Sequence, residues 1–447
     1  MSPHAVITPT ISPVIDEAIT KEFAVTENGF LPKSAPSKRL SDSYYAPWER
    51  LAYRLPLLIQ EERIRCEVDL LPVLSVDNLR SEEDWRRAYV ILTFLTHGYI
   101  WGGQKAAEIL PPAITVPLLK ISSHLELPPV ATYAGLALWN FASPSSSFED
   151  VESLKALLTF TGTEDESWFY MVSVAMECQG AQVISKMLRA LEALRVRDLD
   201  SVSAALEWLP ERFRTIGDML DRMHERCDPM VFYHDIRPFL AGTKNMSAAG
   251  LPRGVFFDEG DGKGKWTELR GGSNGQSSLI QFFDEVLGVE HKPATRQSPT
   301  GKKEEVSYHE EVRGYMPGPH RRFLEHLPRL GSIRNYVAQI ADREGNDGEA
   351  ISPEEARLRV AYKGATAALT EFRNRHLNLV ARFIILPARQ GRNGPGRPGA
   401  ENLASASSAL ARQKGAQAEL TGTGGTALLP FLKHVRDETW RAGSEIK

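Results

Sequence analysis

The stretch TEFRNRHLNLVARFII, residues 370–385, decides the fold of this chain and contains its most informative side chain. Apolar residues recur at intervals of three and four, at Leu369, Phe372, Leu379, Val380 and Phe383. This spacing predicts a helix with one apolar face turned toward the protein core. His376 falls in the same row, so its imidazole is expected on a buried helix face.

The same helix has clear start and stop signals. Ser352-Pro-Glu-Glu provides Ser352 as the N-cap, Pro353 at the first helical position and Glu355 to complete a capping box. Pro387 is expected to end the helix, because proline removes a helical hydrogen bond. A helix of about 34 residues is about 50 Å long at 1.5 Å per residue. Such a helix can span a whole domain.

His376 can be interpreted in two ways. A single histidine on an apolar helix face is more often a hydrogen-bonded core residue than a ligand. An imidazole on a rigid buried helix can also be the single axial ligand of a haem iron, with the opposite face open to oxygen. Arg373, one turn earlier, would then be placed to pair with a haem propionate. The helix alone leaves both interpretations open.

The composition is that of an ordinary globular protein. The 447 residues are 42% hydrophobic and 25% charged, with a net charge of −4 and a pI of about 6.3, so no nucleic-acid partner is expected. No apolar run reaches about 18 residues, so no membrane partner is expected. Three distant cysteines indicate no disulfide framework and favour a reducing, cytoplasmic location. We also expect a monomer.

Length and shifts in composition predict two domains. Residues 1–40 are expected to be a flexible N-terminal arm, 41–150 a small helical domain and 151–447 a large helical domain, with a boundary in the Ser/Pro patch after residue 142. The low-complexity residues 388–421 are expected to be a mobile lid or linker. Helical patterns cover residues 81–101, 130–140, 167–194, 200–227, 230–242, 277–288 and 319–327, and a further one ends near 337. The patternless residues 290–305 are expected to form a surface loop.

Two glycine-rich loops are candidates for ligand binding. Residues 271–278, GGSNGQSS, have little side-chain bulk, which suits close approach of the backbone to a ligand. Residues 422–426, GTGGT, end the low-complexity segment, and their amides can meet an anion when a lid closes. An ordinary turn and an inserted loop are the alternatives. Neither loop is followed by Gly-Lys-Ser or Gly-Lys-Thr, so neither predicts a phosphate site of the Walker type.

Six segments, in the same order along the chain, resemble indoleamine 2,3-dioxygenases, particularly their fungal members. Six ordered motifs are far more specific than any one of them, and the resemblance covers about residues 44–440. The segments are WFYMVS (168–173), FYHDIR (232–237), GGSNGQSS (271–278), YMPGPHR (315–321), RNRH (373–376) and GTGGT (422–426).

The resemblance implies an all-α fold. It also implies a two-domain helical haem protein, in which the small N-terminal and large C-terminal domains hold haem b between them. His376 would be the proximal ligand of the iron, and ferrous iron would be the active form. The family inserts dioxygen across the indole C2–C3 bond of L-tryptophan and gives N-formylkynurenine, the first step of the kynurenine pathway. L-tryptophan and O2 are therefore the expected ligands. No side chain is assigned as catalytic, because the chemistry would take place on the haem iron.

The resemblance also assigns side chains to the substrate pocket. Phe169 and Ser173 lie four residues apart, so they share one helix face and would form a wall above the haem. Tyr133 would approach the same pocket from the small domain, and Phe232 would pack against the indole. Ordinary core packing is the alternative for Phe169.

Arg237 is the expected clamp for the substrate carboxylate, because a planar guanidinium binds a carboxylate through two parallel hydrogen bonds. A structural ion pair with Asp228 or Asp235 is the alternative. Thr423, in the second glycine loop, would help to bind the same carboxylate once the lid closes.

Gly272, Ser273 and Asn274 in the first glycine loop would contact the haem, and Ser273 would contact the substrate as well. The chain departs from the animal pattern of the family at Leu136, Ala137, Tyr170, Tyr233 and Asn274. The bulkier and more polar Asn274 puts the tolerance for other indoles in doubt. A haem-binding sensor or carrier on the same scaffold is the alternative function, and a helical interaction protein without a cofactor is a third.

Overall fold

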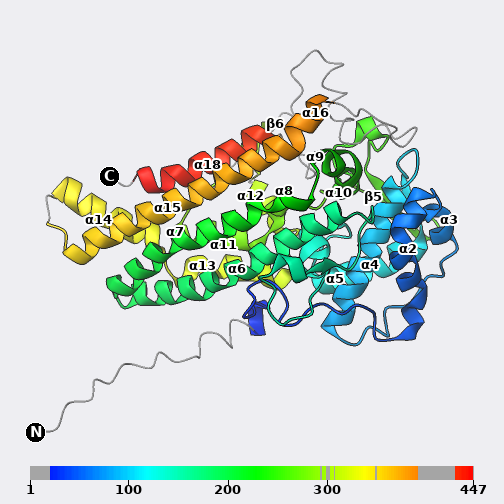
Figure 1. Ribbon diagram of the computed structural model, residues 1–447, viewed down its shortest axis with the longest axis horizontal. Coiled ribbons are helices and arrows are strands. Elements are labelled where there is room, and N and C mark those ends of the chain that lie inside the picture. Colours follow the sequence, from blue (N-terminus) through cyan, green and yellow to red (C-terminus); the bar gives the residue numbers. More distant parts are fainter. Residues whose placement is uncertain are drawn as a thin grey trace, which may run out of the picture.

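Helices dominate the computed structural model, which describes residues 21–291, 294–297, 303–306, 308–347, 350–390 and 428–445. This confirms the predicted all-α fold class. The N-terminal helices lie at one end of an elongated body, and the long C-terminal helices extend from there toward the other end (Figure 1).

The helices at the N-terminal end surround one central helix, α4. Its start follows the prediction: Ser81 is the N-cap and accepts a hydrogen bond from the backbone of Asp84 at 3.2 Å. Most side chains from Ala88 to Trp101 are buried, so α4 is covered on nearly all sides. The helices of this region are α2 (Ala46–Gln60), α3 (Ile64–Asp69), α4 (Glu82–Trp101) and α5 (Pro112–Leu125).

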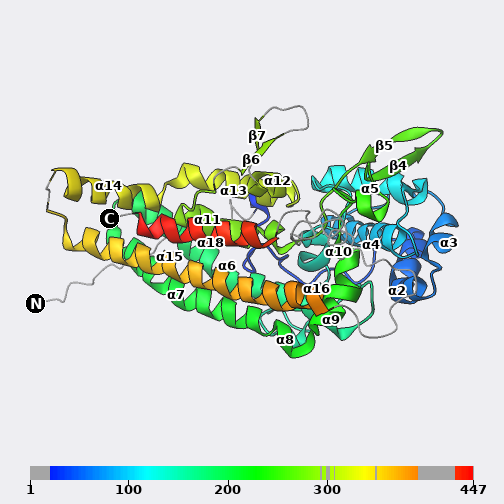
Figure 2. The same ribbon diagram turned by 90° about the horizontal axis from the view of Figure 1, so that it is seen from above.

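The C-terminal part is built on four long helices. The predicted capping box of α15 is confirmed, because Ser352 and Glu355 each bind the other's backbone N–H at 3.1 Å. Helix α15 packs along α7 and α18, and α6 packs against α7 (Figures 1 and 2). The longest elements are α6 (Glu164–Arg195), α7 (Leu199–Asp221), α15 (Pro353–Val380) and α18 (Leu428–Ser444). The shorter ones are α8 (Met223–Arg226), α11 (Ser278–Leu287), α12 (Tyr308–Arg313), α13 (Gly318–Leu330) and α14 (Ile333–Asp347).

Among the described residues, three helical segments contain a π-turn that the sequence did not predict. The predicted helix 130–140 is the short π-segment η2 (Ala134–Leu138). The predicted helix 230–242 is divided into α9 (Pro229–Val231), the π-segment η4 (Phe232–Ile236) and α10 (Arg237–Leu240).

The long helix does not end before Pro387. Helix α15 continues through the π-segment η7 (Ala381–Ile385) into α16 (Leu386–Gln390). Pro387 lies in the first turn of α16, directly after the π-segment η7, so the α-helical pattern changes to a π-turn before the proline and the chain stays helical beyond it. The prediction that this proline ends the helix was therefore wrong.

In the described part of the chain, three small sheets interrupt the helices. Strand β1 (Ile109–Leu110) runs parallel to β4 (Val255–Gly260), which pairs antiparallel with β5 (Lys263–Thr267). Strands β2 (Phe141–Ala142) and β3 (Lys155–Ala156) pair antiparallel. The predicted loop 290–305 contains a third pair, β6 (Ala294–Gln297) with β7 (Lys303–Val306). Its polar sequence has no apolar alternation, so periodicity could not reveal this hairpin.

The described residues form two hydrophobic cores. One joins the N-terminal helices to the first half of α6, and the other joins α7, α11, α13, α14 and α15 to the second half of α6. Phe23 and Phe30, from the predicted flexible arm, are buried in the second core. Residues 21–40 are therefore anchored, since folding buries their aromatic rings. Residues 1–20 and 391–427 lie outside the described part of the chain, and the domain boundary stays a prediction.

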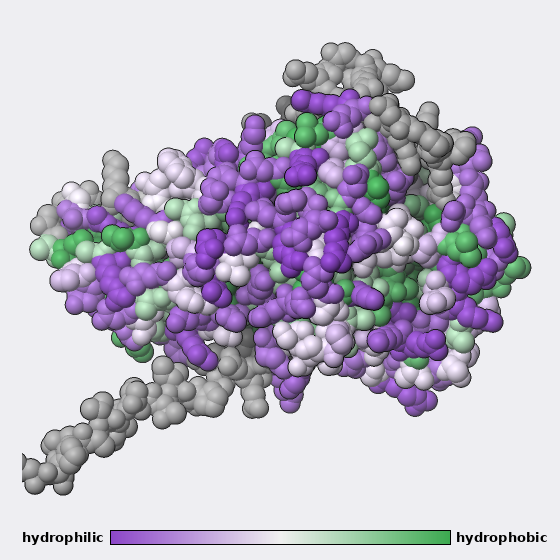
Figure 3. All heavy atoms as spheres, in the orientation of Figure 1, coloured by the Kyte–Doolittle hydropathy of each residue, from purple (hydrophilic) through white to green (hydrophobic). Residues whose placement is uncertain are grey.

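The surface shown in Figure 3 is predominantly hydrophilic, with small scattered hydrophobic spots. Among the described helices, none is both long enough and apolar enough to cross a membrane. Cys66, Cys178 and Cys227 are free thiols in the structure.

Candidate active site

A large, mostly apolar cavity is lined by α6, α15, α18 and the first glycine loop, together with Tyr133 from the N-terminal part. The centres of water molecules can occupy about 230 Å³ within it, whereas one water needs roughly 10–15 Å³. The space therefore suits a ligand of many atoms. Of the residues predicted for the site, those brought to its wall are Tyr133, Phe169, Ser173, Phe232, Arg237, Gly272, Ser273, Asn274, Arg373 and His376.

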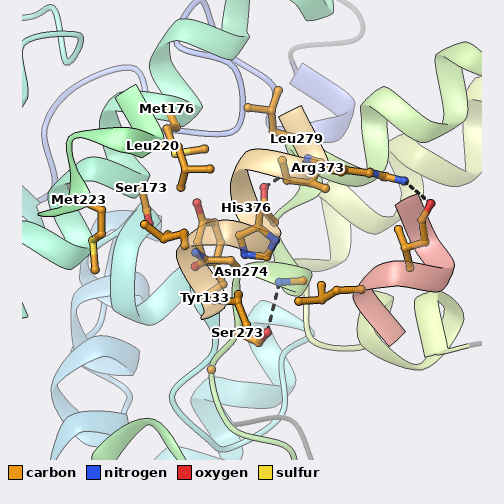
Figure 4. Close-up of a pocket in the computed structure, with 18 of the residues that line it drawn as sticks. Tyr133, Ser173, Met176, Leu220, Met223, Ser273, Asn274, Leu279, Arg373 and His376 are labelled. Carbon is orange, nitrogen blue, oxygen red and sulfur yellow. Dashed lines mark hydrogen bonds between the residues drawn. The ribbon is translucent and has the colours of Figure 1, made fainter. Parts of the chain in front are cut away.

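His376 projects from α15 into this cavity. Figure 4 shows its imidazole among Ser173, Tyr133 and Asn274. Burial lowers the pKa of His376 to about 4, and the charge of Arg373 lowers it further. The ring is thus neutral at physiological pH, as a metal-ligating nitrogen must be. No described residue makes a hydrogen bond to either ring nitrogen, which argues against the core-histidine interpretation.

Arg373 is already engaged by the protein. One guanidinium nitrogen donates to both carboxylate oxygens of Asp284, at 2.6 and 2.8 Å, and another donates to the carbonyl of Val435 at 3.0 Å and to the hydroxyl of Thr439. A haem propionate would therefore share Arg373 with Asp284. The predicted propionate contact stays a prediction.

Asp284 belongs to a buried ionic network that the sequence did not reveal. His291 joins Asp284, at 3.0 Å, to Glu438 on α18, at 2.7 Å. The imidazole of His309 stacks on that of His291 with 3.6 Å between ring centroids and 10° between planes. Asp284, His291 and His309 come close enough to suggest a metal site. Parallel rings cannot direct two lone pairs at one ion, and Arg373 already balances Asp284, so this network is a set of ion pairs.

One face of α6 forms a wall of the cavity. Phe169 and Ser173 both line it, as their spacing predicted. Phe169 packs against Phe232 with 4.9 Å between ring centroids, and Phe232 packs edge-on against Phe383 at 5.8 Å. These three rings offer an apolar surface to a flat aromatic ligand.

Glu177, one turn beyond Ser173, also lines the cavity and was missed by the sequence analysis. Its Oε1 accepts hydrogen bonds from the Tyr133 hydroxyl at 3.0 Å and from the Ser277 hydroxyl at 2.6 Å. Burial raises the pKa of Glu177 to about 7, although both hydroxyls lower it in part. The row of positions 169, 173 and 177 was the signal that could have identified it.

Arg237 begins α10, directly after the π-segment η4. The side chain is 5% exposed, and its guanidinium carbon lies 5.4 Å from the ring centroid of Tyr233. Burial lowers the pKa of this guanidinium, which nevertheless stays charged. Asp228, one proposed ion partner, instead caps α9 by accepting from the backbone of Met230 and Val231. A buried cation at the wall of an apolar cavity can bind a ligand carboxylate.

The first glycine loop approaches the rest of the protein closely. A Cβ on Gly272 would lie 2.3 Å from Leu136 Cδ1 and 2.9 Å from the carbonyl oxygen of Ala131, so a side chain there must displace its neighbours. The hydroxyl of Ser273 accepts a hydrogen bond from the backbone of Gly275 at 3.2 Å, drawn in Figure 4. The loop thereby packs its backbone closely against other protein atoms at the cavity wall, and its predicted contact with a ligand stays a prediction.

Thr423 and the whole second glycine loop, residues 422–426, lie outside the described residues. Among the departures from the animal pattern, only Asn274 lines the cavity; Leu136 and Ala137 lie in η2, and the Tyr170 hydroxyl donates to Glu166 at 2.8 Å. Substitution at Asn274 is therefore the departure that can act directly on a ligand.

The chain is similar to known proteins over nearly its whole length. A model of the indoleamine 2,3-dioxygenase family matches residues 19–442. The chain is 38% identical to the indoleamine 2,3-dioxygenase of Aspergillus nanangensis, over 93% of the chain and 94% of that protein. It is 39% identical to that of Saccharomyces cerevisiae, over 92% and 90% respectively. It is also 36% identical to a 6-hydroxytryptophan 2,3-dioxygenase of Fusarium equiseti, over 92% and 94%.

Proposed function

Because the chain belongs to the indoleamine 2,3-dioxygenase family and is therefore an oxidoreductase, we propose that it inserts both atoms of O2 across the indole C2–C3 bond of L-tryptophan. The product of this reaction is N-formylkynurenine. The observation that carries the proposal is the neutral imidazole of His376, which faces an apolar cavity with a buried arginine in its wall.

The cavity residues fit haem, the cofactor that membership of this family supports. His376 supplies a neutral nitrogen, and Gly272 lets the loop backbone pack closely against Leu136 and Ala131 at the cavity wall. Ser273 and Asn274 add polar groups, and Arg373 adds a positive charge near His376. When bound through His376, ferrous haem supplies the site at which dioxygen is activated.

The protein's own task is to bind and orient the substrate. The rings of Phe169 and Phe232 can hold the indole, whose apolar faces match theirs. Arg237 can bind the carboxylate, and Thr423 is proposed to assist it. Orientation of this kind contributes several kcal/mol to a reaction between two bound partners, provided that the enclosed site excludes water.

The test is product formation by purified protein loaded with haem. L-tryptophan, O2 and a reductant should give N-formylkynurenine, which is identified by its absorbance and mass. Because one relative is named for 6-hydroxytryptophan, the same assay should compare that compound with L-tryptophan. Haem-loaded protein that makes no product from either compound would contradict the proposal and leave the sensor or carrier alternative.

A further inference from the structure

Glu177 ties three separate segments of the cavity wall together. The carboxyl group is 2% exposed and lies on α6, one turn beyond Ser173. It accepts hydrogen bonds from the hydroxyl of Tyr133, which precedes η2, and from the hydroxyl of Ser277, which caps α11. Moving this carboxyl would therefore shift both the wall that carries Tyr133 and the end of the first glycine loop.

Only one of the two carboxyl oxygens is used in these contacts. Both hydroxyls donate to Oε1, whereas Oε2 is buried and has no hydrogen-bond partner among the described residues. Buried polar atoms without partners are uncommon, because each costs about 1–3 kcal/mol. Since Oε1 already accepts two donors, a proton on this carboxyl belongs on Oε2, where it removes the cost of a buried charge.

The carboxyl can carry either charge state near neutral pH. Burial raises the pKa of Glu177 to about 7, and only the hydroxyls of Ser277 and Tyr133 oppose the shift. The other charged or titratable groups on the wall come from α10, α11, α12 and α15, and none of them moves this pKa. They are Arg237, Asp284, Tyr308, His309, Arg373 and His376.

We propose that Glu177 is a positioning residue of the dioxygenase: it holds the hydroxyls of Tyr133 and Ser277, and the proton on its free oxygen controls how tightly the indole substrate binds. This inference rests on the proposed function. A bound indole removes water from the cavity, and dehydration penalises the charged carboxylate more than the neutral acid. Substrate therefore binds preferentially to the protonated form.

The pH dependence follows from this preference. Below pH 7 the carboxyl is already protonated, so the KM for tryptophan should be constant. Above pH 7 a proton must be taken up when substrate binds, so KM should rise, by up to tenfold per pH unit. Glu177→Gln keeps an acceptor oxygen but cannot ionise, so its KM should stay flat across this range.

Helix α6 provides a matched control. Glu166 is fully buried in the same helix, accepts the Tyr170 hydroxyl at 2.8 Å and does not line the cavity. Glu166→Gln should therefore retain the rise in KM. The experiment measures KM and kcat from about pH 6 to 8.5 for the wild type and both variants. A rise in KM that persists in Glu177→Gln would overturn the proposal.

An infrared measurement makes the test independent of activity. Difference spectra of haem-loaded wild-type protein should show a protonated carboxyl band that disappears with a midpoint near pH 7. The band should be missing in Glu177→Gln and present in Glu166→Gln. Tyr133→Phe removes one donor to the carboxylate and should move the midpoint to higher pH, whereas Tyr170→Phe should not. An unmoved midpoint in Tyr133→Phe would contradict the assignment.

The two proposals can fail separately. Absence of product from wild-type protein contradicts the dioxygenase function. If Glu177→Gln turns over normally and its KM rises with pH as in the wild type, only the positioning role of Glu177 is contradicted. A wild-type carboxyl band that does not titrate near pH 7 would also contradict only that role.

Discussion

Removal of one partner from the buried ion pair between Asp284 and Arg373 should destabilise the protein, because it leaves a buried charge without its counter-ion. Burial alone would raise the pKa of Asp284, but the charges of Arg373 and His291 lower it well below its usual value, so the carboxylate is ionised. The Asp284 side chain is 5% exposed and that of Arg373 is 9% exposed. Asp284→Asn therefore leaves the cation of Arg373 buried without its anionic partner.

The destabilisation caused by Asp284→Asn can be estimated from the burial of the ion pair. Breaking a buried pair by removing one charge costs roughly 3–5 kcal/mol. A chain of 447 residues, at about 2.1 cal/mol/K per residue, has an unfolding entropy of about 0.9 kcal/mol/K. Asp284→Asn should therefore lower the melting temperature by about 3–5 °C at pH 7. Thermal melting followed by circular dichroism measures this change.

Asp218→Asn is the matched control. Asp218, on α7, pairs at 2.8 Å with Arg375, which lies on α15 as Arg373 does. The side chain of Asp218 is 51% exposed. Exposed pairs contribute about 0–1 kcal/mol, so this variant should melt within about 1 °C of the wild type. Equal melting temperatures for Asp284→Asn and Asp218→Asn would show that burial of the first pair adds nothing.

Four further results are expected. His376→Ala should purify without a Soret band after haem supply, because the axial ligand is lost; normal haem content would show that the ligand is assigned wrongly. Arg237→Ala should keep its haem but raise the tryptophan KM at least about tenfold, since a charge-assisted hydrogen bond is lost. An unchanged KM would show that Arg237 does not bind the substrate carboxylate. Gly272→Ala should be destabilised by about 1–3 kcal/mol in urea unfolding, whereas Gly275→Ala, whose Cβ would meet nothing nearer than 3.4 Å, should match the wild type. Although burial lowers the pKa of His291, its carboxylate neighbours outweigh this and raise it above 6.5. The stability that His291 contributes is therefore present below pH 6.5 and is lost as pH rises above that value. Melting temperatures of the wild type should fall more above pH 6.5 than those of His291→Gln, and parallel curves would refute this.

Local signals in the sequence predicted the elements that depend on local chemistry. The N-caps at Ser81 and Ser352 and the helical spacing of Phe169 and Ser173 are read from neighbouring residues alone, and all three are confirmed. The ionic network could not be predicted in this way. His291 follows α11 and lies 147 residues from Glu438 in sequence, and the packing of both α11 and α18 against α15 brings the two together.

The three π-segments show why helical spacing alone places a site only approximately. A π-turn holds one extra residue, and each residue of an α-helix turns the next side chain by about 100°. Segment η2 follows Tyr133, η4 precedes Arg237, and η7 contains Phe383, so all three adjoin residues of the cavity wall. A regular helix in place of η4 would turn Arg237 by about 100° relative to Phe169 and Phe232. The cavity therefore depends on breaks in helical regularity, which have no compositional signature, as much as on the apolar faces that the sequence displays.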